Sequence, residues 1–273
     1  INFALGGAEA LGTQTLLEAA GPAIPGNVLA AIAALPPDKR APIEALFYQN
    51  INLSSQVASL VATTSVQAPS ADSALVSMIG LNDLRELAKS FDPGNPLALL
   101  GALQLAGNIV KANLDVAQTA FNLGIGTVIL ETLPAASFFP VSNQFPAEFR
   151  SIGDAAVDVI NLGLEAGAAS LRAQGYDVRI VDLARMADEI TADPGTFGFV
   201  NLGQPTLLGN GIQFSANPSA PPVGQTAFFD PIHATTDLHG VLAAFSAASL
   251  TYRTDFRGSG NDSIFGSSDN DFV

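Results

Sequence analysis

Cysteine is absent from the 273-residue sequence, and charged side chains make up only 13% of it. Without cysteine the chain has no disulfide, no thiol nucleophile and no thiolate ligand for a metal. The 11 basic residues, three lysines and eight arginines, are scattered along the chain. They form no run that could neutralise successive phosphates, so nucleic-acid binding is disfavoured.

Hydrophobic runs long enough for a membrane helix are also lacking. The longest apolar stretch, residues 96–110, is interrupted by Gln104 and Asn108 and is shorter than the ~20 residues that a bilayer requires. The sequence opens on Ile1 with no signal peptide pattern. We therefore expect a soluble chain whose first residue results from cleavage or whose sequence continues upstream.

The residues that are present indicate a folded acidic protein. Hydrophobic residues make up 48% of the chain, and 25 acidic against 11 basic side chains give a net charge of −14. Disordered chains combine low hydrophobicity with dense charge, so global disorder is excluded. The length suffices for one large domain with a sizeable core.

Apolar periodicity alternates between strands and helices along the chain. The predicted strands are residues 1–5, 74–79, 127–130 and 178–181. The predicted helices are residues 9–20, 27–34, 42–63, 97–122, 145–174 with Gly175 as its stop, a short helix ending near Asp193, and 235–250. Proline and glycine crowd residues 201–225, which are predicted to form an irregular loop. This alternation favours an α/β fold with helices on both faces of a parallel sheet, and with its functional groups at the carboxyl ends of the strands.

Three short segments at these strand ends carry residues suited to acyl transfer. They read NFALGGA at residues 2–8, GLND at residues 80–83 and DPIH at residues 230–233. Histidine suits the base in this chemistry because its pKa lies near neutrality. His233 follows Asp230 by three residues, which lets the carboxylate hold one ring nitrogen and leaves the other free to face a serine.

In this order the segments resemble the second, third and fifth blocks of the SGNH, or GDSL-type, serine esterase and lipase family. The resemblance covers residues 1 to about 250. It implies a flavodoxin-like three-layer α/β/α fold. It implies that His233 is the base and acid and that Asp230 orients it. It also implies that Gly7, or Gly6 in its place, donates to the oxyanion together with Asn82.

The nucleophilic serine of that family has no counterpart in the sequence. The family carries it in a Gly-Asp-Ser block at the end of a first strand, upstream of the second block. Gly153-Asp154 is followed by Ala155 inside a predicted helix, and Ser137 lies outside the expected strand-to-helix turn. We expect the missing strand, which is central in the family's sheet, to come from a companion N-terminal fragment or from sequence upstream of Ile1.

Candidate substrate-binding residues are Gly80, Phe138 and Phe139. The two phenylalanines follow the predicted strand at 127–130, where they either line an acyl pocket or belong to the local core. Glu131 stands where family members more often carry asparagine. It is either a carboxylate satisfied by loop amides or a second acid with a raised pKa near the triad.

The second histidine and the remaining acid have structural explanations. His239 falls inside the final predicted helix, where we expect packing or hydrogen bonding. A metal site formed by Asp230, His233 and His239 is a weaker alternative, because no further His or Cys completes it. Asp83 is predicted to be a carboxylate at a helix N-terminus, where it opposes the helix dipole.

The C-terminal tail, residues 257–273, is rich in Gly, Ser, Asn and Asp. Nine residues separate Asp262 from Asp271, and the tail resembles the start of an RTX-type nonapeptide repeat. The resemblance implies calcium binding through these two aspartates and export by type I secretion to the extracellular space. The alternative is a flexible tail, because two imperfect copies fall short of a stable solenoid.

Taken together, the sequence predicts a domain at residues 1–252 of SGNH hydrolase type and a partial repeat at 253–273. The predicted function is hydrolysis of a lipid acyl ester, an acetylated sugar or a short aliphatic ester, with no catalytic cofactor. One alternative is a secreted calcium-binding scaffold that keeps the fold without the nucleophile. Another is an acyltransferase that passes the acyl group to an alcohol. A serine-bearing companion segment separates the first alternative from the hydrolase, and product analysis separates the second.

Overall fold

The structure is a computed structural model that describes only part of the chain. The described residues are 10–11, 26–47, 52–90, 92, 95, 97–209, 214–222, 224–251, 253–254 and 271–272. The predicted strand at 1–5, the predicted oxyanion glycines Gly6 and Gly7, and most of the predicted helix at 9–20 therefore lie outside the described residues.

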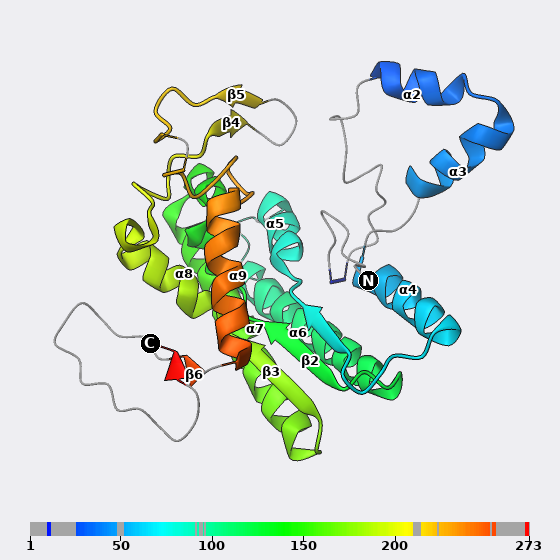
Figure 1. The fold of residues 1–273 in the computed structure, drawn as a ribbon. Coiled ribbons are helices and arrows are strands. Elements are labelled where there is room, and N and C mark those ends of the chain that lie inside the picture. The colour runs from blue at the N-terminus through cyan, green and yellow to red at the C-terminus, as the bar shows by residue number, and fades with distance from the viewer. Residues whose placement is uncertain are drawn as a thin grey trace.

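Helices and short strands alternate along the described chain (Figure 1). The α-helices are α2 (Gly26–Ala33), α3 (Pro37–Phe47), α4 (Leu53–Val66), α5 (Leu81–Ser90), α6 (Ala98–Asn122), α7 (Ala147–Ala173), α8 (Leu183–Ala192) and α9 (Thr236–Thr251). The 3-10 helices are η2 (Ala136–Phe138), η3 (Pro140–Gln144) and η4 (Pro194–Phe197). The strands are β1 (Ala74–Ser77), β2 (Thr127–Glu131), β3 (Asp177–Val181), β4 (Leu207–Gly209), β5 (Phe214–Ala216), β6 (Arg253–Thr254) and β7 (Asp271–Phe272).

The main sheet has three parallel strands in the order β1-β2-β3. Val76 of β1 stands opposite Ile129 of β2, which stands opposite Arg179 of β3. The central strand β2 has a buried interior, whereas β1 alternates between exposed and half-buried residues. The predicted α/β class with a parallel sheet is confirmed for the described residues.

Two hydrophobic clusters lie on opposite faces of this sheet. Successive residues of a strand point to opposite faces. Val128 and Leu130 of β2 therefore belong to one cluster with α6 and α7, while Ile129 belongs to another with α8 and α9. In Figure 1 α9 crosses in front of the strands and α6 and α7 lie behind them. The sheet therefore separates the two clusters and contributes side chains to both.

Two glycines bring α7 directly against α6. A Cβ atom built on Gly163 would lie 2.7 Å from Cγ2 of Val110. One built on Gly167 would lie 2.3 Å from Cδ1 of Leu114. Side chains of α6 thus occupy the space that a larger residue in α7 would need, and the two helices pack closely behind the sheet.

The helices differ from the prediction most clearly at residues 42–63. The predicted single helix at 42–63 is wrong, because α3 and α4 are separate helices. Asn52 caps the start of α4: its Oδ1 accepts from the Ser55 N–H at 2.8 Å, and Ser55 Oγ accepts from the Asn52 N–H at 3.3 Å. In this capping box side-chain oxygens accept from two backbone N–H groups at the start of α4. In an uninterrupted helix these N–H groups would donate to carbonyls of the preceding turn. The predicted stop after α7 is confirmed, since Gly175 has φ +93°.

The C-terminal third contains structure that the sequence did not indicate. The predicted irregular loop at 201–225 is wrong in part, because β4 and β5 pair there as antiparallel strands. Near the end of the chain β6 and β7 pair in parallel. Asp262 lies outside the described residues, and only the backbone of Asp271 is described, so calcium binding there stays a prediction. Among the described helices, none combines the length and the apolarity needed to cross a membrane.

Candidate active site

The segment DPIH folds around the Asp230 carboxylate. Its Oδ1 accepts hydrogen bonds from the backbone N–H groups of Ile232 and His233, each at 2.8 Å. Its Oδ2 lies 2.7 Å from Nδ1 of His233. An ionised carboxylate only accepts hydrogen bonds, so Nδ1 carries the proton and Nε2 is left as the basic nitrogen. The predicted pairing of Asp230 with His233 is present in the structure.

The two partners differ sharply in exposure. The Asp230 side chain is 6% exposed, whereas the His233 side chain is 73% exposed. Burial raises the pKa of Asp230, but hydrogen bonds from the His233 ring and from the His233 and Ile232 amides outweigh it, so the pKa lies below its ordinary value. Asp230 is therefore a carboxylate at neutral pH. Among the described residues, Nε2 of His233 has no hydrogen-bond partner.

Backbone hydrogen bonds fix the loop that carries this pair. The Phe229 N–H donates to the His233 carbonyl at 2.8 Å, and the Thr235 N–H donates to the Ala227 carbonyl at 2.9 Å. The Thr235 hydroxyl donates to the Thr226 carbonyl at 2.8 Å. The loop is thus closed on itself just before α9 begins.

Aromatic packing anchors the same loop to the sheet. Phe228 is fully buried and meets Phe138 and Phe139 edge to face, with ring centroids 5.4 and 5.9 Å apart. The Val141 N–H also donates to the Pro231 carbonyl at 2.8 Å, so the segment after β2 supports the loop directly. Phe138 and Phe139 thus belong to the core cluster, which is the packing alternative that their sequence position left open.

The carboxyl end of β1 carries the second predicted segment. Gly80 has φ +133°, a region that side chains rarely adopt, and a Cβ there would lie 2.8 Å from Cγ2 of Ile109. Asn82 follows in the first turn of α5 and is half-buried. Glycine is therefore required at the turn that brings Asn82 to this end of the sheet.

Asp83 links this turn to the start of the chain. Its Oδ2 accepts from the Ala10 N–H at 2.6 Å and its Oδ1 from the Leu11 N–H at 2.9 Å. Burial outweighs these bonds and raises the pKa of Asp83. Asp83 stands in the first turn of α5 as predicted, but its backbone partners lie more than 70 residues away in sequence. Ala10 and Leu11 are therefore attached to the first turn of α5, which also carries Asn82.

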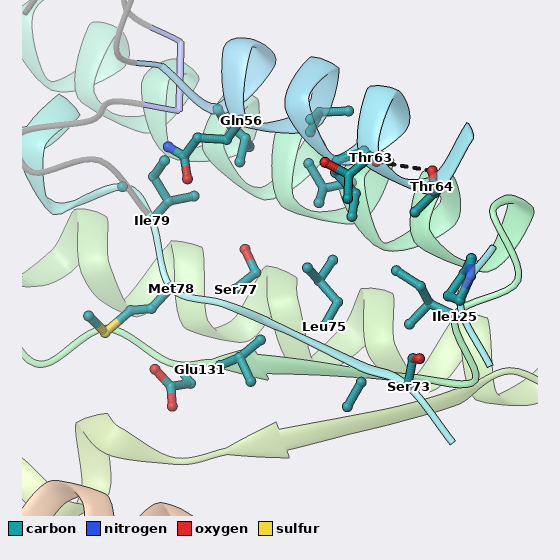
Figure 2. Close-up of a pocket in the computed structure, with 18 of the residues that line it drawn as sticks. Gln56, Thr63, Thr64, Ser73, Leu75, Ser77, Met78, Ile79, Ile125 and Glu131 are labelled. Atoms are coloured by element: carbon teal, nitrogen blue, oxygen red, sulfur yellow. Dashed lines mark hydrogen bonds between the residues drawn. The ribbon is translucent and has the colours of Figure 1, made fainter. Parts of the chain in front are cut away.

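A groove of about 1000 Å³ runs between β1 and α4 (Figure 2). Figure 2 shows Leu75 and Ser77 of β1 on one side and Gln56 and Thr63 of α4 on the other. Gly80 and Asn82 border the groove as well. Of the residues predicted to take part in catalysis or substrate binding, the described ones thus fall into two groups: Asp230 and His233 with the phenylalanines, and Gly80 with Asn82.

Glu131 ends β2 and borders the same groove. Burial raises its pKa, and a hydrogen bond with the Ser246 side chain of α9 opposes that shift. Its partner is thus a hydroxyl of α9 and not the loop amides of the first alternative, while the raised pKa agrees with part of the second. No hydrogen bond joins Glu131 to His233 among the described residues.

The remaining candidates lie apart from the pair. His239 is exposed on α9, so the packing role expected for it is wrong. Ser137 lies in η2, where its N–H donates to Asp154 Oδ1 at 2.8 Å, and it makes no hydrogen bond with His233. In the part of the chain that the structure describes, no three His, Asp or Glu residues gather in a way that could hold a metal ion.

Sequence reasoning missed the aromatic support of the loop and the anchor at Asp83. Phe228 lies two positions before Asp230 of the DPIH segment, and the aromatic pair at 138–139 was visible as a cluster. Nothing in the sequence indicated that they meet. A scan against protein-family models and a search of curated proteins each found no match for this chain.

Proposed function

We propose that this chain supplies the acid–base pair and oxyanion donors of a secreted SGNH-type carboxylic ester hydrolase. The carrying observation is the Asp230–His233 pair, in which a buried carboxylate fixes the ring through Nδ1 while Nε2 faces outward. That is the arrangement a serine hydrolase needs in its base. The flavodoxin-like layering implied by the resemblance is part of this proposal, supported by a parallel sheet with a hydrophobic cluster on each face.

The proposed reaction proceeds in two acyl-transfer steps. Nε2 of His233 takes the hydroxyl proton of a serine as the serine oxygen attacks the ester carbonyl. The imidazolium then gives that proton to the departing alcohol, leaving an acyl-enzyme. In the second step Nε2 takes a proton from water, the hydroxide attacks the acyl carbon, and the serine leaves with the proton. Asp230 stabilises the imidazolium in both steps.

The oxyanion of each tetrahedral intermediate needs donors in a fixed position. We assign these to the Asn82 side chain and the Gly7 N–H. A well-placed donor of this kind contributes about 2.7–4 kcal/mol to the barrier reduction. The position of Asn82 in the first turn of α5 and the attachment of Ala10 to Asp83 support this assignment.

The nucleophile comes from a segment outside these 273 residues in our proposal. Ser137, the weak candidate within the chain, is engaged at its backbone with Asp154 and makes no hydrogen bond with His233. The segment is either a companion fragment or sequence joined to this chain. The exposure of His233 leaves Nε2 open to such a partner.

Fluorophosphonate labelling of the protein from cells expressing the complete reading frame tests the proposal. We expect denaturing mass spectrometry to place the label on a serine of a companion segment or of a longer chain. A label within the 28.0 kDa chain would overturn the external nucleophile, and no label would retire the enzyme in favour of the calcium-binding scaffold.

The two histidines offer a matched control for the base. We expect His233→Ala to slow labelling by about 10²–10⁴-fold, the usual contribution of a general base. His239→Ala removes the other histidine, which is also exposed, and we expect it to leave the labelling rate unchanged. Equal rates in the two variants contradict the role of His233.

A further inference from the structure

The residues on either side of the Asp230 turn pair as two short extended segments. Phe228 and Ala234 form an antiparallel bridge, and the Phe229 N–H donates to the His233 carbonyl at 2.8 Å. Residues directly opposite each other in an antiparallel pair place their side chains on the same face, and the next pair along uses the other face. Phe229 and His233 are therefore cross-strand neighbours on the face turned away from Phe228.

Burial follows this alternation. Phe228 is fully buried, and Ala234 packs against the same hydrophobic cluster. Phe229 in contrast is 49% exposed, and His233 is exposed beside it. About half of the surface of Phe229 thus lies in solvent next to the imidazole.

A second exposed apolar side chain stands close to Phe229. The Leu207 N–H donates to the Phe229 carbonyl at 2.8 Å, which brings the start of β4 against the turn. Leu208, the next residue of β4, is exposed. Single exposed apolar residues are common on proteins, but these two stand on segments joined by a hydrogen bond, beside the proposed base. They form a small apolar surface next to His233.

The proposed reaction determines which part of an ester this surface meets. Nε2 of His233 gives its proton to the oxygen of the departing alcohol, so that oxygen lies within hydrogen-bond reach of Nε2. The acyl chain branches from the carbonyl carbon, one bond further from the imidazole. The alcohol part of the substrate is therefore the part nearest to His233 and to its neighbour Phe229.

We propose that Phe229, together with Leu208, binds the alcohol part of the ester and selects substrates in which that part is an alkyl or aryl group. This inference rests on the proposed function and names its substrate class. An acetylated sugar fits poorly, because the hydroxyl groups of its alcohol part need hydrogen-bond partners that these two side chains do not supply. Phe229 is thus a specificity residue that takes no part in proton transfer.

The placement of the two side chains can be tested without any activity. NMR of the 273-residue chain measures nuclear Overhauser effects between the Phe229 ring and the His233 side chain. We expect cross-peaks between them, because the two residues are cross-strand neighbours. Absence of these cross-peaks overturns the inference whether or not the protein is an esterase.

Two series of esters test the selectivity, on protein from the complete reading frame. One series varies the alcohol part (methyl, butyl and octyl acetate), and the other varies the acyl part (methyl acetate, butyrate and octanoate). We expect Phe229→Ala to lower kcat/KM for octyl acetate by about tenfold, the effect of one or two buried methylene groups, and to leave the acyl series within about twofold. Phe229→Leu keeps an apolar side chain and should retain most of the preference for octyl acetate. Leu162→Ala, at an exposed position of α7, is the control and should leave both series unchanged.

The inference and the proposed function fail separately. If the unaltered protein hydrolyses methyl acetate, but Phe229→Ala lowers both series equally, the acyl series alone or neither, the esterase stands and the role of Phe229 is overturned. Faster hydrolysis of an acetylated glucoside than of octyl acetate overturns the substrate class. If the unaltered protein hydrolyses no ester of either series, the proposed function is overturned, and the role of Phe229 falls with it.

Discussion

The loop before α9 and the open edge of β1 are opposites in how their polar groups are satisfied. The loop buries Asp230 and gives its carboxylate three donors, and Phe228 fixes it to the core. The β1 edge leaves the backbone groups of Ala74 and Val76 without a partner strand among the described residues. The Asp230–His233 pair is thus held by contacts within the described chain, whereas Gly80 and Asn82 follow a strand whose outer edge has no partner strand among the described residues.

The largest expected effect comes from Asp230→Asn, in the loop before α9. The asparagine amide donates to the ring where the carboxylate accepted, so His233 adopts the tautomer that carries its proton on Nε2. If the proposed hydrolase activity is present, we expect its kcat/KM for a nitrophenyl ester to fall by about 10⁴-fold. ¹⁵N NMR of the imidazole should show the proton moving from Nδ1 to Nε2.

Asp237→Asn, in the first turn of α9, is the control for that change and should keep full activity. A loss of less than about tenfold in Asp230→Asn would show that the loop does not act through the carboxylate. The low pKa of Asp230 adds a pH signature. Its contribution to stability is present above the unfolded value of 3.8 and is lost as the pH falls through the folded pKa.

Two valines on neighbouring strands give the next largest effect and compare the two kinds of strand directly. Val128 of β2 is fully buried and Val76 of β1 is 55% exposed. We expect Val128→Ala to lower the free energy of unfolding by about 2–3 kcal/mol and Val76→Ala by less than about 0.5 kcal/mol, measured by urea denaturation of the 273-residue chain. Equal losses contradict the open edge.

The smallest expected effect concerns Glu131, which lies between the two regions. Its raised pKa means that the folded state binds the proton more tightly, so stability falls as the pH rises from 4.5 through the folded pKa. Glu131→Gln removes this dependence and should stabilise the chain at pH 7 by less than about 1 kcal/mol. Glu165→Gln, at an exposed position of α7, is the control in urea titrations at pH 4 and pH 7. A destabilised Glu131→Gln contradicts the sign.

The strands of the sheet could be predicted because their signals are local. The strands at 127–130 and 178–181 were found to within one residue, since each is an apolar run bounded by glycine or a polar turn. The pairing of Asp230 with His233 was also predictable, because three residues separate them. The break between α3 and α4 was missed, although Asn52 and Ser55 form a capping box whose signal is present in the sequence.

The parts that could not be predicted depend on residues distant in the chain. Asp83 accepts hydrogen bonds from Ala10 and Leu11, which lie more than 70 residues earlier in the sequence. Phe228 meets Phe138 across some 90 residues, and no periodicity reports such a contact. The antiparallel pair of β4 and β5 was missed for a different reason: its partners are close in sequence, but each strand is only three residues long and shows no clear apolar alternation.

The close packing of α6 and α7 through Gly163 and Gly167 has a consequence for the order of folding. These helices and the three parallel strands come from one continuous stretch, residues 74–181, but the strands pair residues that are far apart in sequence, Ala74 with Thr127 and Thr127 with Asp177. Such parallel pairings form slowly, because a long loop must close before the contacts stabilise it. We therefore expect the docking of α7 against α6, which brings β2 and β3 together, to be a slow step in folding.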